Sequence, residues 1–330
     1  MKKRCFLSVE QPQYISFPNQ TFANSIVLAN AKEKKSIIWC SKYINCYFRE
    51  DVKGYSFIIA TEDQFWTRQD IMQMQKIDLS METIQSAKLN LGLIIKKCLL
   101  NGCYVSGQCN GKKLDNNIST GTSPFVFLIA GFDDLRHKFL VCGIDSDEQF
   151  KCFDIQYQPF LTALTDNDFS DMILYLWRYN KDANISLGLP YIITELKHYI
   201  NSSCSSNIQG DDKVYGIKAI EALSRYFYET ANKNRRLREA ELHAFYMHIF
   251  FMKQRVEVLA QLGFVDSRWL TEAEEVRQIG ENVFELGKQY NSQQTEKLAK
   301  KLVEQIEKTV NLELFYLPKV LSEIENAYKA

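Results

Sequence analysis

The chain has 330 residues, a length typical of about two domains, and 46% of them are hydrophobic, as in ordinary globular proteins. Lysine plus arginine and aspartate plus glutamate number 40 each, and this balance argues against nucleic acid as the main partner. No apolar segment reaches the ~18–20 residues of a membrane helix or forms a signal core, so we expect a cytoplasmic protein without a membrane partner.

The nine cysteines bear on the compartment and on metal binding. Their number is odd, their spacings are irregular, and no CxxC pair occurs. Zinc sites normally use such close pairs, so the sequence predicts no metal site and no cofactor. We expect reduced and largely buried thiols, as in a reducing compartment.

The first hundred residues combine helix signals with less distinctive segments. Pro18 suits a helix start, and Asn19 or Thr21 could cap the helix. Apolar residues recur three and four positions apart from Thr83 to Leu100, and Asn101-Gly102 follows, which predicts one helix there. Residues 36–48 and 56–61 fit either helix or strand. A strand is expected to begin near residue 103.

The middle of the chain reads as a small antiparallel sheet. A polar stretch at 106–123 predicts a long loop. Three apolar runs separated by acidic turns then predict a meander, and two shorter elements follow it. The expected strands are 125–131, 138–144, 150–155 and 172–179, with a short amphipathic piece at 158–164.

Residues beyond 186 are predicted to be mainly helical, with a polar linker at 201–212. Thr271 to Glu274 has the form of a capping box that opens a helix. Helices are expected at 186–199, 214–228, 237–262, 292–310 and 314–328, the last interrupted early by Pro318. We therefore expect an α/β domain at 1–180, a helix and linker at 181–212, and an antiparallel helical bundle at 213–330.

One motif runs through the predicted meander. Phe125 is followed by five residues and Gly131-Phe132-Asp133, then by a strand ending at Asp145, and then by Tyr157-Gln-Pro-Phe160. This layout resembles papain-like peptidases of the bacteriocin-processing type. The resemblance implies that Phe125 stands where that family has its catalytic histidine, and that the family's aspartate is kept as Asp145.

The same resemblance extends to the amino-terminal segment. Such enzymes have an oxyanion-hole glutamine six residues before the nucleophilic cysteine, which starts a helix. Gln13 and Asn19 have this spacing here. Gln13 would then be the oxyanion residue and Asn19, or Pro18 with a shift of one residue, would replace the cysteine. None of these replacements can act as a nucleophile.

Over most of its length the chain is similar to the family of the butirosin biosynthesis protein H amino-terminal domain. The segments at 213–217 and 245–263 contribute to this resemblance. It implies an α+β chain, with a papain-like cysteine-peptidase fold followed by an all-α antiparallel helical bundle. The named family member transfers an acyl group from a carrier protein to an amine in bacterial natural-product biosynthesis.

Two main hypotheses follow from the altered triad. The first is an acyltransferase or transamidase of secondary-metabolite biosynthesis, of the nonribosomal peptide type. It would form amide bonds directly from a carrier-protein thioester and a small amine, without a protein nucleophile. The second is a non-catalytic pseudoenzyme that binds an acyl chain or a partner protein in the old cleft. Peptidase activity is not expected, and a housekeeping metabolic role stays open.

A few other residues are candidates with a plainer interpretation beside each. Cys109 is the remaining possible reactive thiol, although an ordinary thiol is favoured. The basic run with Arg235, Arg236 and Arg238 could dock an acidic carrier protein, or could be a solvated face. The histidines and turn acids fit structural roles better than metal or catalytic ones: His137, His243, His248, Asp133, Asp134, Asp147 and Glu148.

Overall fold

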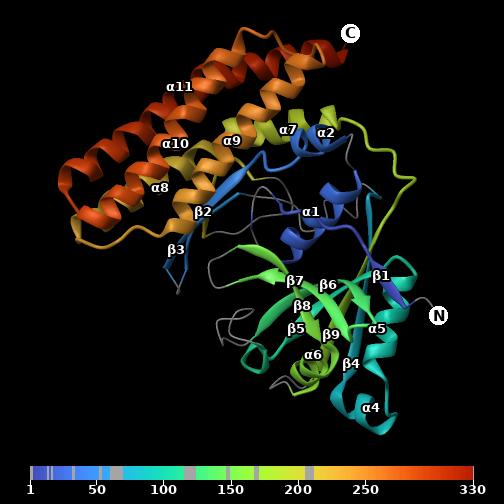
Figure 1. The fold of residues 1–330 in the computed structure, drawn as a ribbon. Helices are drawn as coiled ribbons and strands as arrows, with labels where there is room; N and C mark the ends of the chain where they lie inside the picture. Colours follow the sequence, from blue (N-terminus) through green and yellow to red (C-terminus); the bar gives the residue numbers. More distant parts are fainter. Residues whose placement is uncertain are drawn as a thin grey trace. The chain divides into compact units, whose positions relative to one another are not determined.

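The structure is a computed structural model that describes residues 3–12, 15, 18–31, 34–51, 54–59, 70–114, 124–145, 149–166, 171–204 and 212–329. The chain forms two compact units, which we call the sheet unit, Met1–Glu33 with Asp63–Asn184, and the helical unit, Lys34–Glu62 with Ile185–Ala330 (Figure 1). This division differs from the expected boundaries, because residues 34–62 are grouped with the carboxy-terminal helices.

The sheet unit contains a seven-stranded antiparallel sheet in which β1 pairs with β6 beside the main order β4-β9-β5-β6-β7-β8. Its strands are β1 (Arg4–Phe6), β4 (Met72–Ser80), β5 (Tyr104–Cys109), β6 (Phe125–Asp133), β7 (Lys138–Ile144), β8 (Phe150–Gln156) and β9 (Asp171–Tyr179). The predicted meander is confirmed as β6, β7 and β8. The sequence analysis did not predict β4, although apolar and polar residues alternate in its Met-Gln-Met-Gln start, as is typical of a strand.

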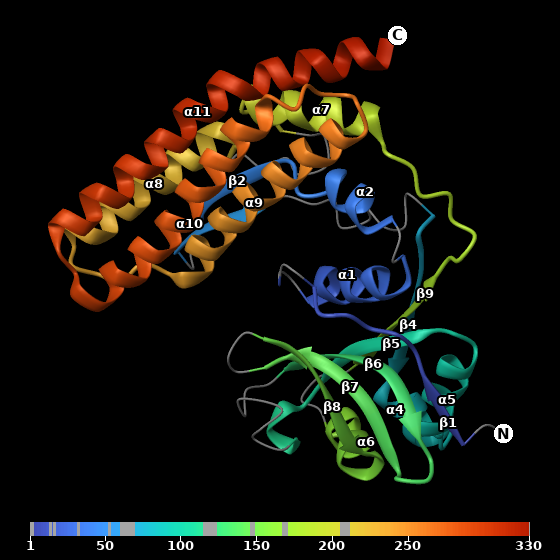
Figure 2. The same ribbon diagram turned by 45° about the horizontal axis from the view of Figure 1, so that its top comes forward.

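The two faces of this sheet carry different helices (Figure 2). On one face, α5 (Leu91–Leu100) and α6 (Tyr157–Thr165) share a core with Val105 and Phe127, and the rings of Phe127 and Phe160 lie 5.1 Å apart. Because neighbouring strand residues point to opposite faces, Tyr104 points the other way. Its hydroxyl accepts a hydrogen bond of 3.2 Å from Asn30 of α1 (Pro18–Asn30). Helix α1 therefore packs on the face opposite α5 and α6.

The single helix predicted at 83–100 is two helices, α4 (Met81–Ser86) and α5. Lys88 has a positive φ of 47°, which ends the helical path before α5 begins. The side chain of Asn90 then accepts a hydrogen bond from the Leu93 amide at 2.9 Å and caps α5. The apolar spacing continues across the break, and this is why periodicity alone gave one helix.

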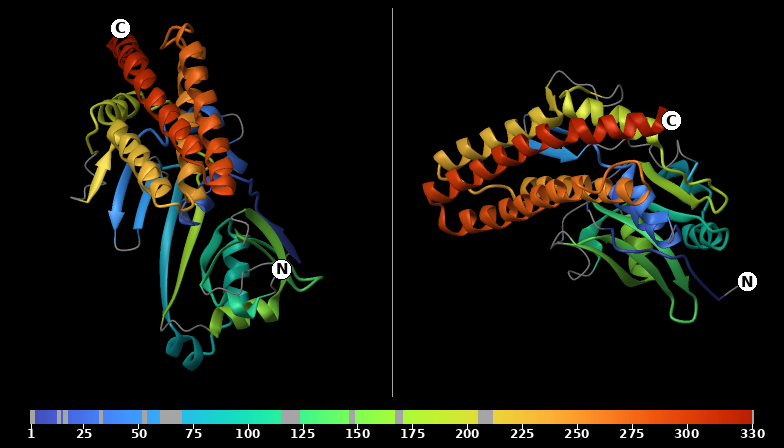
Figure 3. Two further views of the ribbon diagram at one scale, coloured as in Figure 1. Left: turned by 90° about the vertical axis from the view of Figure 1, so that its left-hand side faces the viewer. Right: turned by 90° about the horizontal axis from the view of Figure 1, so that it is seen from above.

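The helical unit combines long antiparallel helices with a small sheet (Figure 3). Its sheet has the order β10-β2-β3, from β10 (Lys213–Tyr215), β2 (Cys46–Asp51) and β3 (Gly54–Ile59). Its helices are α2 (Lys35–Cys40), α7 (Leu189–Ile200), α8 (Gly216–Asn232), α9 (Glu239–Gln261), α10 (Trp269–Gln293) and α11 (Glu296–Lys329). Helices α9, α10 and α11 follow one another side by side, as expected for a bundle.

Two expectations for the carboxy-terminal helices are wrong: the helices expected at 292–310 and 314–328 form one helix, α11, and the capping box expected at Thr271 does not form. Helix α11 runs without interruption through Pro318, which removes the hydrogen bond to the Leu314 carbonyl. Leu314 is 46% exposed, so this turn of the helix faces solvent, where the loss of one hydrogen bond is less costly than in the core. Helix α10 begins at Trp269, so Thr271 lies inside it and Glu274 bonds to Arg277 instead of forming a capping box.

A buried arginine holds the connection between α2 and β2, residues 41–45, all of which are buried. Nε of Arg255 donates to the Cys40 carbonyl at 2.8 Å, and Nη2 donates to the Lys42 carbonyl at 2.6 Å. Nη1 lies 3.0 Å from the Met252 sulfur. A buried connection must satisfy its carbonyls without water, and Arg255 supplies two of the donors.

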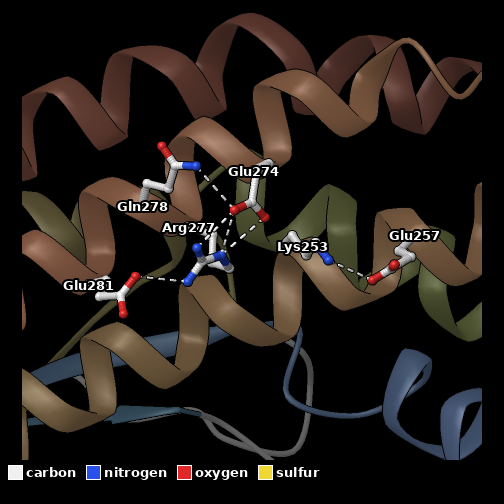
Figure 4. Close-up of polar contacts among 6 residues, drawn as sticks. All are labelled: Lys253, Glu257, Glu274, Arg277, Gln278 and Glu281. Atoms are coloured by element: carbon white, nitrogen blue, oxygen red, sulfur yellow. Dashed lines mark hydrogen bonds and ion pairs between the residues drawn. The ribbon is translucent and has the colours of Figure 1, made fainter.

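A second arginine, on α10, lies in a charged network nearer the surface (Figure 4). Arg277 bonds to Glu274 at 2.8 Å and to Glu281 at 3.0 Å, and Lys253 on α9 pairs with Glu257 at 2.7 Å. The hydrogen bond from Arg277 holds the pKa of Glu274 below its usual value. Such partly exposed ion pairs contribute little net stability.

These two arginines give a matched test of the helical unit. Arg255→Met should lower the free energy of unfolding by about 2–4 kcal/mol, because it leaves two buried carbonyls without a donor. The same change at Arg277 should cost less than about 1 kcal/mol. Urea titration of both variants checks this. Equal losses at the two positions would contradict the anchoring role of Arg255.

Candidate functional site

The structure places the expected triad positions as follows. Gln13 lies outside the described residues. Asn19 is the second residue of α1 and is exposed, as expected for the start of that helix. Phe125 is the first residue of β6 and is buried, and Asp145 directly follows β7.

The side chain of Phe125 points away from α1. It belongs to the core on the face of α5 and α6, together with Phe127 two residues on. A Cβ atom at Gly143 would collide with its ring, so Phe125 covers the glycine on the neighbouring strand. The residues of β6 that alternate with these, Val126 and Leu128, are apolar. Among its described residues, the strand therefore has no general base on the face that is directed toward α1.

Asp145 has a structural role in the turn between β7 and β8. Its Oδ1 accepts a hydrogen bond from the Gln149 amide at 2.9 Å, and its Oδ2 pairs with Lys151 of β8. The carboxylate is only 5% exposed. These contacts fit the interpretation of Asp145 as a turn residue.

The remaining candidate thiol, Cys109, is not in a polar loop. Strand β5 extends to this residue, which corrects the loop expected from 106 onward. Its side chain is fully buried in the core, and burial raises its pKa to about 12. A thiol with such a pKa is almost entirely protonated at neutral pH, so Cys109 is unsuited to nucleophilic attack.

His137 is the one histidine in the sequence of the sheet unit, and it lies far from Asp145. It precedes β7 in the turn after β6 and has a φ of 53°. The centroid of its ring lies 6.1 Å from that of Tyr157. The seven residues of β7 separate it from Asp145, a span of roughly 23 Å. The two residues cannot form a catalytic pair in this arrangement.

Two cysteines of the sheet unit form a disulfide, contrary to the expectation that all thiols are reduced. Cys142 of β7 and Cys152 of β8 face each other in register and are bonded. Their spacing of ten residues carries no recognisable motif, which is why the sequence did not reveal the pair.

The basic run of the helical unit lies between α8 and α9. Arg235 and Arg236 are exposed, and neither has an ion-pair partner among the described residues. Arg238 instead pairs with the buried carboxylate of Glu241 at 3.1 Å. The candidate docking surface is therefore carried mainly by the first two arginines.

The helical unit contains a group of polar side chains that the sequence reading missed. We call it the buried polar cluster and define it as Tyr199 of α7, His248 and Arg255 of α9, and Glu313 and Tyr316 of α11. All five side chains are at most 1% exposed. The Tyr199 hydroxyl donates to Oε2 of Glu313, and its ring lies 5.0 Å from that of His248. Tyr199 thus joins α9 to α11.

Burial perturbs the titrating groups of this cluster strongly. It raises the pKa of Glu313 to about 7, although the bond from Tyr199 and the charge of Arg255 oppose the rise. It lowers the pKa of His248 to about 3, and Arg255 adds to that effect. Perturbed groups of this kind are enriched at functional sites but also occur in structural networks.

A weak signal for the cluster was present in the sequence. Glu313 and Tyr316 are three residues apart on α11, on the face that also buries Val310 and Leu317. A glutamate within an apolar stripe is unusual and could have marked the position. His248 and Arg255, seven apart on α9, also share a face, but the aromatic stripe around them predicted only core packing.

Comparisons with known proteins add no identification, since no family model matches the chain and no curated protein matches its sequence. Within the ranges given above, no group of three or more acidic, histidine or cysteine side chains is placed to hold a metal ion. None of the helices described has both the length and the apolar content needed to cross a bilayer.

The raised pKa of Glu313 predicts in which direction the free energy of unfolding changes with pH. The folded chain keeps this proton up to about pH 7, whereas the unfolded chain releases it near 4.5. The stabilisation that Glu313 contributes to the folded state is therefore complete below about pH 4.5 and is lost as the pH rises toward 7. Relative to Glu313→Gln, the parent should lose up to about 3 kcal/mol of unfolding free energy across this range.

His248 titrates in the opposite sense, so only the difference between the parent and the variant isolates Glu313. Denaturant titrations from about pH 4.5 to about pH 8 give this difference. Glu296→Gln is the control, since the pKa of this exposed carboxyl is lowered by Lys300 rather than raised. A parent-minus-variant difference for Glu313 that does not change with pH would show that its pKa is ordinary.

Proposed function

We propose that the chain is a non-catalytic, papain-related protein of bacterial secondary-metabolite biosynthesis that binds an acyl chain or a partner protein, namely the carrier protein that holds the acyl chain. The observation that supports binding over catalysis is the placement of Phe125. Its side chain belongs to the core shared with α5 and α6, and the β6 residues on the side of α1 are apolar, so covalent catalysis lacks a base there.

Three cysteines of the sheet unit support the same proposal. Cys109 is buried with a raised pKa, and Cys142 and Cys152 are bonded to each other. Asn19 occupies the expected position of the nucleophile and has no nucleophilic atom. An acyl-enzyme intermediate at the expected site would therefore need a nucleophile that the site does not provide.

This proposal predicts binding without turnover. An acylated carrier protein should associate with the chain, while the acyl group should not move to the chain or to an added amine. Intact-mass spectrometry of both proteins and a product assay check this. An acyl adduct on a cysteine would contradict the loss of a nucleophile, and amide formation above the background rate without an adduct would favour direct transfer instead.

The basic segment between α8 and α9 supplies a surface for the carrier. Its backbone is fixed by α10, because Asn291 exchanges hydrogen bonds of 2.7 and 2.9 Å with Leu237 and the Tyr290 hydroxyl donates to the Arg235 carbonyl at 3.3 Å. Arg235 and Arg236 thus extend from a held backbone into solvent. Exposed cations of this kind attract an acidic partner at a range limited by salt screening.

Replacing Arg235 and Arg236 with glutamate should weaken binding of an acidic carrier more than tenfold, or about 1.4 kcal/mol. The control is Lys218→Glu with Lys329→Glu, which changes the net charge equally at other exposed positions. Calorimetric titration at two salt concentrations measures the effect. Equal affinities for the two double variants would show that the arginines do not form the docking surface.

A further inference from the structure

Several polar atoms of the buried polar cluster have no hydrogen-bond partner among the described residues. They are Nδ1 and Nε2 of His248, Oε1 of Glu313 and the hydroxyl of Tyr316. Oε2 of Glu272, a residue that interacts electrostatically with Tyr316, also has no hydrogen-bond partner among the described residues. Buried polar atoms are nearly always bonded, and each orphan costs about 1–3 kcal/mol. Five such atoms point to a common occupant.

The orphan atoms belong to side chains that share neighbours. Tyr199 contacts the ring of His248 and bonds to Glu313, and Tyr316 lies one helical turn beyond Glu313 on the same face of α11. Tyr199 and Tyr316 also lie close enough to interact electrostatically, as do Tyr316 and Glu313. The orphan atoms therefore come from α9, α10 and α11 of one unit, and contacts and electrostatic interactions through Tyr199 and Tyr316 link the side chains that carry them.

The chemistry of these atoms defines the occupant. A neutral imidazole offers one donor and one acceptor, a hydroxyl offers both, and Oε1 of Glu313 accepts or donates according to its protonation. The occupant must therefore donate and accept hydrogen bonds at once. An ionic ligand is disfavoured, because burying a further charge is costly and the Arg255 guanidinium already donates to the carbonyls of Cys40 and Lys42.

We propose that the buried polar cluster is an internal binding site for water, in which one or more ordered molecules bridge His248, Glu313 and Tyr316. Water is the smallest molecule that both donates and accepts, and buried waters typically make about three hydrogen bonds to such groups. The bridges connect α9 to α11 where no direct side-chain bond joins His248 to Glu313 among the residues described. The site is independent of carrier binding.

The direct test is a high-resolution crystal structure of the full chain, together with water-to-protein nuclear Overhauser measurements on the His248 ring. We expect ordered water within hydrogen-bond distance of His248 and of Glu313 or Tyr316, with a residence time long enough to give transfer from water to the ring. Empty density, or a protein atom in that place, would overturn the proposal. This test needs no variant to fold.

A double-mutant cycle of His248→Phe and Tyr316→Phe gives an independent test. Each change should lower the folding equilibrium constant roughly 5- to 30-fold, because it removes a partner of the shared water. The double variant should lose less than the product of the two factors. The control is His243→Phe on the same helix, which is half-buried and outside the cluster. Single variants as stable as the parent, or strictly multiplicative losses, would indicate a dry cluster.

Discussion

The contact between the Arg255 guanidinium and the carbonyls of Cys40 and Lys42 is the constraint on which the helical unit depends. Residues 34–62 are separated from the rest of that unit by more than a hundred residues of chain, so non-covalent contacts must hold them in place. Backbone carbonyls buried in a connection demand donors, and an arginine can serve more than one of them from a single side chain. The small sheet of β10, β2 and β3 then extends this attachment.

The sheet unit shows how alternation along a strand decides which residues can act together. Phe125 and Asp145 lie where a linear motif would suggest a catalytic pair, yet Phe125 belongs to the core on the face of α5 and α6 while α1 lies on the other face. A shift of one residue in a strand exchanges the two faces completely. Spacing in the sequence therefore constrains a site only once it is known which face of the sheet each side chain points to.

The sequence predicted those elements whose signals are local. The meander from Phe125 to Gln156 and the long helices of the carboxy-terminal half follow from apolar runs, turns and helical spacing. Lys88, whose positive φ breaks a helix, and Pro318, which fails to break one, show the limit of such rules, because apolar spacing reports neither the backbone angle of one residue nor the solvent exposure of one helical turn.

Non-local features were beyond reach of the sequence. The bond between Cys142 and Cys152 depends on the register of two strands, and the buried polar cluster depends on three helices meeting. The grouping of residues 34–62 with the helices likewise reflects contacts across more than two hundred residues of chain, such as that between Lys42 and Arg255.

This discontinuity has a consequence for synthesis on the ribosome. Arg255 is translated 215 residues after Cys40, which at about 5–20 residues per second is a delay of roughly 10–40 s. During that time the nascent segment with Trp39, Ile44 and Phe48 has emerged without the helices that bury it. Exposed apolar segments of this kind are the usual substrates of chaperones and the usual origin of aggregation. The protein's yield in a cell should therefore depend on how the first sixty residues are protected until α9 emerges.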